Sequence, residues 1–226
     1  MTCWPSFRRI LRAAVPRPAL LAVLLAALLV PVSAAAQGAT ITYRKVFKQS
    51  SPEFVELRIR ETGECTYDIR KLDDEAQPQP FEVSAALRER IFRLAEQLNY
   101  FRELDLDVRR RIANLGQKTL RYERDNVSSE VTFNYTLNAA ANQLMQIFEG
   151  LGRQQEHAET LARRIRYDRL GVNEALLRLE ADLNRKGIPE PERLLPVLEQ
   201  IAGDTRVIEI ARHRARALAD RIRSTS

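Results

Sequence analysis

The sequence predicts an α+β fold. We expect an antiparallel four- to five-stranded sheet with two helices on one face, in the order ββαββα, followed by an all-helical C-terminal extension of about four helices. Between residues 39 and 138, segments of alternating apolar and polar residues, typical of half-buried strands, come in pairs separated by helical patterns. After residue 152 the alternation stops and apolar residues recur only at helical spacing. Strands and helices with one apolar side each are most simply buried in a two-layer sandwich.

The first 36 residues predict a signal peptide that is cleaved near Ala36. Four arginines precede an apolar run from Ala19 to Val32, and Ala34, Ala35 and Ala36 supply the small residues that signal peptidase recognises. A membrane-spanning helix needs about 20 apolar residues, and this run is shorter. We therefore expect no transmembrane helix in the mature form. The mature protein is therefore expected in the periplasm or outside the cell. It would consist of an α+β sandwich at 37–152 and a helical region at 153–226.

Removal of the signal peptide changes the charge of the protein. The precursor has 36 Lys and Arg residues against 30 Asp and Glu residues. Because residues 1–36 contain four arginines and no acidic residue, 32 basic residues remain against 30 acidic ones. A nearly neutral mature chain argues against nucleic-acid binding. Only Cys65 remains of the two cysteines, so no internal disulfide can form and stability must come from burial.

The elements of the sandwich can be placed in order. A short strand around Ile41 and Tyr43 precedes a hairpin of two strands, 55–60 and 65–70, which turn at Thr62-Gly63. The loop 73–80 contains Pro78 and Pro80 and is expected to contribute no strand, because proline donates no backbone hydrogen bond.

The second half of the sandwich repeats this order. Ser84 is the predicted N-cap of an amphipathic helix that extends to residue 98. A second hairpin, 120–123 and 131–135, turns at Asp125-Asn126, and a second helix ends near Leu151. The α+β region as a whole is similar in style to uncharacterised domains of exported bacterial proteins.

Four further helices are predicted between residues 161 and 222. The first ends at Gly171, and Asn173 is the expected cap of the second. The third begins near Pro191 and should be strained or kinked by Pro196. The apolar positions of the last helix are its expected inner face: Val207, Ile208, Ala211, Ala215, Leu218 and Ile222. The pair 192–223, with the turn Gly-Asp-Thr-Arg-Val at 203–207 and Ala211, Ala215 and Leu218 behind it, resembles a single HEAT-type repeat. One repeat is too few for a solenoid, so these helices should pack on the sandwich or on a partner.

Groups that could carry out chemistry are few in the mature sequence. His157 and His213 lack a second ligand at metal-binding spacing, and Cys65 occupies an inward strand position typical of a small core residue. Glu103, Asp105 and Asp107 form the sharpest polar cluster, because alternate residues of an extended segment share one side. They are candidates for a metal site or an acid/base pair, but a solvated edge neutralised by the following arginines is the favoured interpretation. No cofactor is expected.

Arginines cluster on two of the predicted C-terminal helices. Arg163, Arg164, Arg166, Arg212 and Arg216 are the candidate residues for binding a partner or an anionic surface. Ordinary solvated helix faces, paired with nearby acids, are the favoured interpretation of these arginines.

The leading functional hypothesis is a non-enzymatic interaction module of the bacterial envelope that binds another envelope protein through residues 153–226. One alternative is an envelope hydrolase that uses the clustered carboxylates. The other is a peripheral binder of anionic lipid or wall polymer through the arginine-rich helices. An exposed apolar groove between the sandwich and the helical region would favour the interaction module.

Overall fold

One long helix, α3 (Ala139–Tyr167), belongs to both halves of the folded chain. The computed structural model describes residues 38–48, 50–108 and 110–225, together with Met1. Met1–Ala36 is a separate unit from Gln37–Ser226, and the predicted signal peptide with its cleavage near Ala36 lies outside the described residues except for Met1.

The first half is an α+β sandwich, as the sequence predicts. Its sheet is antiparallel and has six strands in the order β4-β3-β2-β1-β5-β6. The strands are β1 (Thr40–Val46), β2 (Phe54–Arg60), β3 (Cys65–Arg70), β4 (Gln79–Phe81), β5 (Gln117–Arg124) and β6 (Val127–Phe133). Helix α2 (Ala85–Gln97), the 3-10 turn η1 (Asn99–Phe101) and the first half of α3 contribute to the same core as the inward side chains of the sheet.

The predicted local signals of the sandwich are present. Ser84 is the N-cap of α2, and its hydroxyl accepts a hydrogen bond from the backbone N–H of Leu87. Gly63 in the first hairpin and Asp125 in the second have positive φ, as their turns require. Cys65 is buried in the core, and burial raises the pKa of its thiol, which therefore stays protonated at neutral pH.

The sheet has more strands than the predicted four to five, and the order ββαββα is incomplete. The shorter strand expected around Ile41 is the full-length strand β1, which lies between β2 and β5. The additional strand β4 contains Pro80, inside the loop predicted to have no strand. Proline is tolerated there because β4 is an edge strand and needs backbone partners on one side only.

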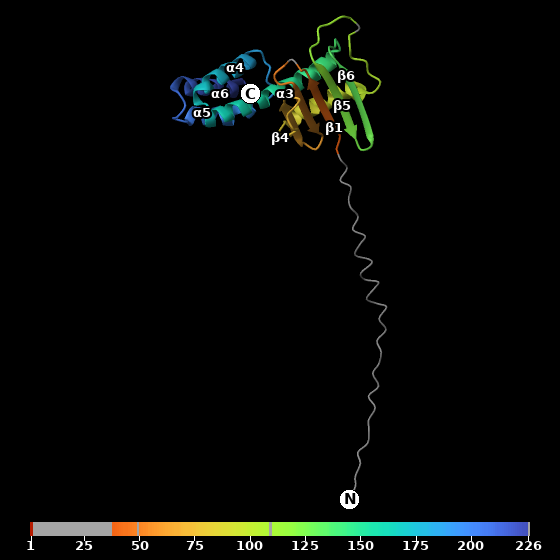
Figure 1. The fold of residues 1–226 in the computed structure, drawn as a ribbon, viewed down its shortest axis with the longest axis horizontal. Helices are drawn as coiled ribbons and strands as arrows, with labels where there is room; N and C mark the ends of the chain where they lie inside the picture. The colour runs from red at the N-terminus through yellow and green to blue at the C-terminus, as the bar shows by residue number, and fades with distance from the viewer. Residues whose placement is uncertain (2–37, 49, 109, 226) are drawn as a thin grey trace. The chain divides into compact units, whose positions relative to one another are not determined.

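The second half is a bundle formed by the end of α3 with α4 (Val172–Asn184), α5 (Leu195–Gly203) and α6 (Glu209–Thr225). Helix α3 contacts α4 and α5, and α6 contacts the same two helices, so α3 and α6 occupy non-adjacent positions. A second hydrophobic core, separate from that of the sheet, fills the bundle from Leu161 to Ile222. Figure 1 shows α3 extending from the sheet to α4, α5 and α6.

The predicted break between the last helix of the sandwich and the first helix of the C-terminal region does not exist. Gly150 and Gly152 lie inside the 29 residues of α3, and the predicted division at 152/153 falls within this helix. A Cβ atom at Gly150 would lie 2.8 Å from the Pro189 ring and 2.9 Å from the Gly187 carbonyl oxygen. This glycine is therefore needed for close packing of α3 on the segment before α5, which outweighs its low helix propensity.

Three details of the bundle also differ from the prediction. Asn173 does not cap α4, which begins one residue earlier, after the 3-10 turn η2 (Arg169–Gly171). Pro196 does not kink a helix, because the expected helix is split into the 3-10 turn η3 (Pro191–Leu194) and α5, and Pro196 lies in the first turn of α5. Ile208 is exposed rather than part of the inner face.

Of the helices in the described ranges, none is both long enough and apolar enough to cross a membrane.

Candidate functional site

The three clustered carboxylates lie on the surface of the sandwich. Glu103, Asp105 and Asp107 are exposed, and the neighbouring Leu106 points into the core. One oxygen of Asp107 accepts hydrogen bonds from the backbone N–H groups of Asn134 and of the next residue, both at 3.3 Å. This carboxylate therefore fastens the segment to the end of β6. Within residues 38–48, 50–108 and 110–225, no group of three His, Cys, Asp or Glu side chains is placed to hold a metal ion.

The five candidate arginines lie on α3 and α6, which are not adjacent in the bundle. Arg164 donates to Asp168 at 3.2 Å and to the Gly171 carbonyl oxygen at 2.8 Å, so it closes the end of α3. Arg212 and Arg216 both pair with Glu209, which lies one and two turns earlier on α6. Arg163 and Arg166 are exposed and form no ion pair with another described residue. These side chains do not form one continuous cationic surface.

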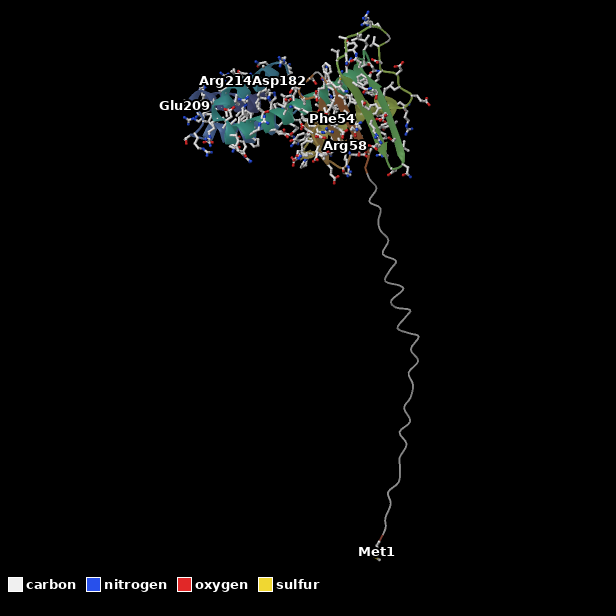
Figure 2. The ribbon with its side chains drawn as sticks, in the orientation of Figure 1. Met1, Phe54, Arg58, Asp182, Glu209 and Arg214 are labelled. Carbon is white, nitrogen blue, oxygen red and sulfur yellow. The ribbon has the colours of Figure 1, made fainter. Side chains whose placement is uncertain are left out.

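A groove lies between α4 and α6 on the bundle. Arg214 of α6 donates to Asn173 at 3.1 Å and to Glu180 at 2.6 Å, and Arg221 donates to Asn184 at 2.9 Å. These contacts follow the same order along both helices, so α4 and α6 run side by side in the same direction. Figure 2 places Arg214 within the bundle, together with Asp182 of α4 and Glu209 of α6.

The α4–α6 groove has an apolar floor and a basic rim. It has a volume of about 270 Å³. Its lining residues are Glu180, Ile210, His213, Arg214, Ala217, Leu218 and Arg221. Ile210 is 57% exposed, and Leu177, which lies between Asn173 and Glu180 on the same face of α4, is 44% exposed. The lining therefore combines one acid and three arginine or histidine side chains with an isoleucine that no other described side chain covers.

The bundle is attached to the sandwich by buried polar contacts as well as by α3. Glu190, immediately before η3, accepts from the backbone N–H of Ser84 at 2.9 Å and from Nε of Arg193 at 2.8 Å. The backbone N–H of Glu190 donates to the side chain of Gln154 at 3.2 Å, and Arg193 also reaches Glu82 at 2.9 Å. The groove is therefore carried by helices that are fixed to the sheet.

A second cluster lies under α3 and was not predicted from the sequence. Lys45 of β1 and Lys118 of β5 are direct cross-strand neighbours on the helix-covered face of the sheet. Lys45 lies 3.4 Å from Glu149 of α3, and the Tyr43 hydroxyl donates to the same carboxylate oxygen at 3.1 Å. Burial, followed by the negative charge of Glu149, raises the pKa of Tyr43 far above its usual range. The sequence pattern could have indicated this cluster. Lys45 and Lys118 each lie two residues from an inward side chain, Tyr43 and Leu120, and therefore point to the same side of the sheet.

The two lysines of this cluster have different roles. Lys118 is only 5% exposed, and burial lowers the pKa of its ammonium group. Its ammonium group donates to the carbonyl oxygens of Leu115, Gly116 and Asn134, at 3.4, 3.4 and 2.8 Å. Lys118 therefore uses its donors to hold the backbone at the start of β5. Lys45 keeps donors that no described residue accepts.

Comparison with known proteins does not add to this description, since neither a protein-family model nor a curated protein sequence matches the chain. The function must therefore be argued from the residues of the α4–α6 groove and of the Lys45 cluster.

Proposed function

We propose that the mature protein is an exported, non-enzymatic interaction module of the bacterial envelope, and that its partner is another envelope protein bound in the α4–α6 groove. The observation that carries this proposal is the exposure of Ile210 in a groove that α4 and α6 line together on a fixed helical scaffold. Isolated exposed apolar residues need no explanation, but an apolar groove with a polar rim is typical of a binding site.

The charges of the rim specify the partner. Arg214, Arg221 and His213 line the groove against a single acidic residue, Glu180. A complementary partner would present acidic residues around one or two apolar ones. The groove between Ile210 and Arg221 is about 17 Å long at the 1.5 Å rise of an α-helix, which corresponds to about three helical turns. We therefore propose an acidic amphipathic helix of the partner as the occupant.

The exported state and the envelope location remain predictions from the leader-like N-terminal sequence. The resemblance of the pair α5 and α6 to a HEAT-type repeat also remains a prediction. The proposal for the groove depends on neither.

The test is recovery of the partner from an envelope extract by the intact mature chain and by point variants. Deletion of residues 153–226 is unsuitable because it would cut α3 in the middle. In Ile210→Asp a carboxylate replaces the apolar side chain in the groove, while an acid in the first turn of α6 is compatible with the helix dipole. We expect this variant to lose the partner, and we expect high salt to weaken recovery by the wild type.

The matched control is Val127→Asp, which introduces the same charge at an apolar residue that is 47% exposed on β6. This variant should recover the partner as the wild type does. Equal recovery of the same proteins by Ile210→Asp and Val127→Asp would exclude the groove as the binding site.

A further inference from the structure

A small cavity lies beside the Lys45 cluster, well apart in sequence from the α4–α6 groove. It is enclosed by the ends of β1, β2 and β3, by the loop at 50–52 and by α3, and its volume is about 170 Å³. Cavities that hold drug-sized ligands have about 300–1,000 Å³. The ligand that fits here is therefore a small molecule of few atoms rather than a polymer or a peptide.

The cavity combines apolar walls with charges of both signs. Val55 and Ile69 supply the apolar wall from the sheet, and Lys45, Arg153, Glu149 and Glu156 supply the charges. Arg153 is engaged, since its guanidinium donates to the Gly187 carbonyl oxygen at 3.0 Å. The carboxylate of Glu149 receives the Tyr43 hydroxyl and Lys45 on one oxygen, Oε1. No hydrogen bond or ion pair joins the carboxylate of Glu156 to any residue among those described.

The half-buried charges of this cavity are incompletely paired. Lys45 makes one long contact of 3.4 Å with Glu149, which leaves two of its three donors unused by the described residues. The second carboxylate oxygen of Glu149 receives no hydrogen bond from a described residue. Half-buried charges that lack partners are costly, and a ligand that supplies the missing partners recovers this cost. A lone anion would satisfy Lys45 but leave this oxygen of Glu149 without a partner, and a lone cation would do the reverse. Glu156 is exposed and adds a negative charge to the lining.

We propose that this cavity binds a small zwitterion of the α-amino acid class, with its carboxylate on Lys45, its ammonium between Glu149 and Glu156, and a short apolar side chain against Val55 and Ile69. The 3.4 Å separation of Lys45 and Glu149 places opposite protein charges side by side. An α-amino acid carries its own opposite charges on adjacent groups, so both pairs can form at once.

Two further observations support this assignment. Lys118, the cross-strand neighbour of Lys45, is occupied by three carbonyl oxygens and does not compete for the ligand carboxylate. Desolvation by neighbouring groups, with smaller contributions from Asp182 and Glu159, raises the pKa of Glu156 despite the opposing charges of His157 and Arg153, although the residue is exposed. A nearby ligand ammonium would offset this desolvation and stabilise the ionised carboxylate.

The experiment is isothermal titration of the intact mature chain with glycine, L-alanine and L-valine, and with propionate and ethylammonium as probes that carry a single charge. We expect at least one of the three amino acids to bind at millimolar concentration or below. Each single-charge probe should bind about tenfold more weakly or worse, because it leaves one protein charge unpaired. Absence of binding for all three amino acids, or equal binding of propionate or ethylammonium, would overturn the proposal.

Two substitutions locate the site. Lys45→Met and Glu156→Gln should each weaken binding of the amino acid about tenfold, since each removes one charge-assisted contact. Lys71→Met and Glu192→Gln change the same residue types at exposed positions outside the cavity and should bind as the wild type does. Circular dichroism confirms that each variant is folded before titration. Unchanged affinity in folded Lys45→Met or Glu156→Gln would contradict the assignment.

Discussion

The carboxylate of Glu190 is a buried acceptor at the point where the bundle meets the sandwich, and the residue is only 4% exposed. It accepts from a backbone N–H in one half of the chain, at Ser84, and from Arg193 in the other. A buried donor that loses its acceptor costs more free energy than the hydrogen bond itself contributes. Single residues of this kind therefore have large effects on stability.

We expect Glu190→Ala to lower the free energy of unfolding by about 3 kcal/mol, because it leaves the Ser84 N–H without its acceptor and removes the buried one of the two carboxylates that Arg193 contacts. Urea unfolding followed by circular dichroism measures the change. The exposed neighbour Glu192 is the control, and Glu192→Ala should stay within about 0.5 kcal/mol of the wild type. A similar loss in both variants would show that burial of Glu190 is not the cause.

Asp182 gives a pH-dependent prediction. Burial alone would raise its pKa, but hydrogen bonds from Arg185 and His157 outweigh burial and hold the pKa below the ordinary value of 3.8. A carboxyl group with a lowered pKa in the folded state contributes stability above its unfolded pKa, and this contribution disappears as the pH falls through the folded pKa. Asp182→Asn should therefore be less stable than the wild type at neutral pH.

The difference between Asp182→Asn and the wild type should shrink below about pH 4, where the carboxyl of the unfolded chain becomes protonated. Urea unfolding of both proteins at neutral and acidic pH tests this expectation. A difference that does not change with pH would mean that the charge of Asp182 is not what stabilises the α3–α4 contact.

At the level of elements, α3 shows how close packing overrides local helix propensity. The glycines of α3 suggest a break when the sequence is considered alone, since glycine in a helix interior costs about 1 kcal/mol relative to alanine. The structure has no break, because the absent Cβ of Gly150 lets α3 approach the Pro189 ring and the Gly187 carbonyl.

Gly150→Ala should therefore destabilise the protein by about 1–3 kcal/mol through overpacking, although alanine is the better helix former. Gly203→Ala is the matched control, because Gly203 ends α5 and a Cβ atom there meets nothing within 4 Å. We expect the control to be neutral or slightly stabilised. Thermal unfolding of both variants distinguishes the two effects, and a stabilised Gly150→Ala would refute the close-packing explanation.

The elements that could be predicted from sequence are those with strong local signals. Ser84 marked the start of α2, and the turns at Gly63 and Asp125 marked both hairpins. The strand containing Pro80 could not be predicted, because its pairing with β3 at the sheet edge is a long-range contact with no local pattern. The packing of α3 against Pro189, which keeps α3 continuous, is also a long-range contact that the local sequence does not indicate.

The candidate sites were predictable to different degrees. The sequence predicts that the helical region binds a partner, and this stays a prediction. The arginines that it selects are engaged at a helix end or lie on two separate helices, α3 and α6. The groove depends on residues of both α4 and α6, such as Glu180 and Ile210, which line it together only when the two helices pack. Lys45 and Lys118 could have been identified as inward charges, because the alternation of inward and outward residues in β1 and β5 continues to these two positions.

At the level of the whole molecule, two hydrophobic cores share one helix. The first core ends at Leu151 and the second begins at Leu161, both on α3. Because α3 has no break and Glu190 ties the halves together, we expect residues 38–225 to unfold in one cooperative transition.

Two probes can test this cooperativity in the mature chain. Five of its six tyrosines, from Tyr43 to Tyr135, lie in the sandwich, whereas far-ultraviolet circular dichroism reports mainly on the helices. The two urea midpoints should coincide in the wild type and should shift together in Leu179→Ala, which opens a cavity in the bundle core at a cost of about 2–5 kcal/mol. Separated midpoints would show that the halves unfold independently.

The continuity of α3 also bears on how such a protein can change by recombination. A crossover between residues 139 and 167 would join two half-helices, and each half would lose contacts in the core that it was taken from. The exposed connection 72–78, between β3 and β4, is in contrast a surface loop in which an inserted domain would disturb neither core. The sheet and the bundle are therefore expected to be inherited together, and additions to the protein should accumulate at that loop.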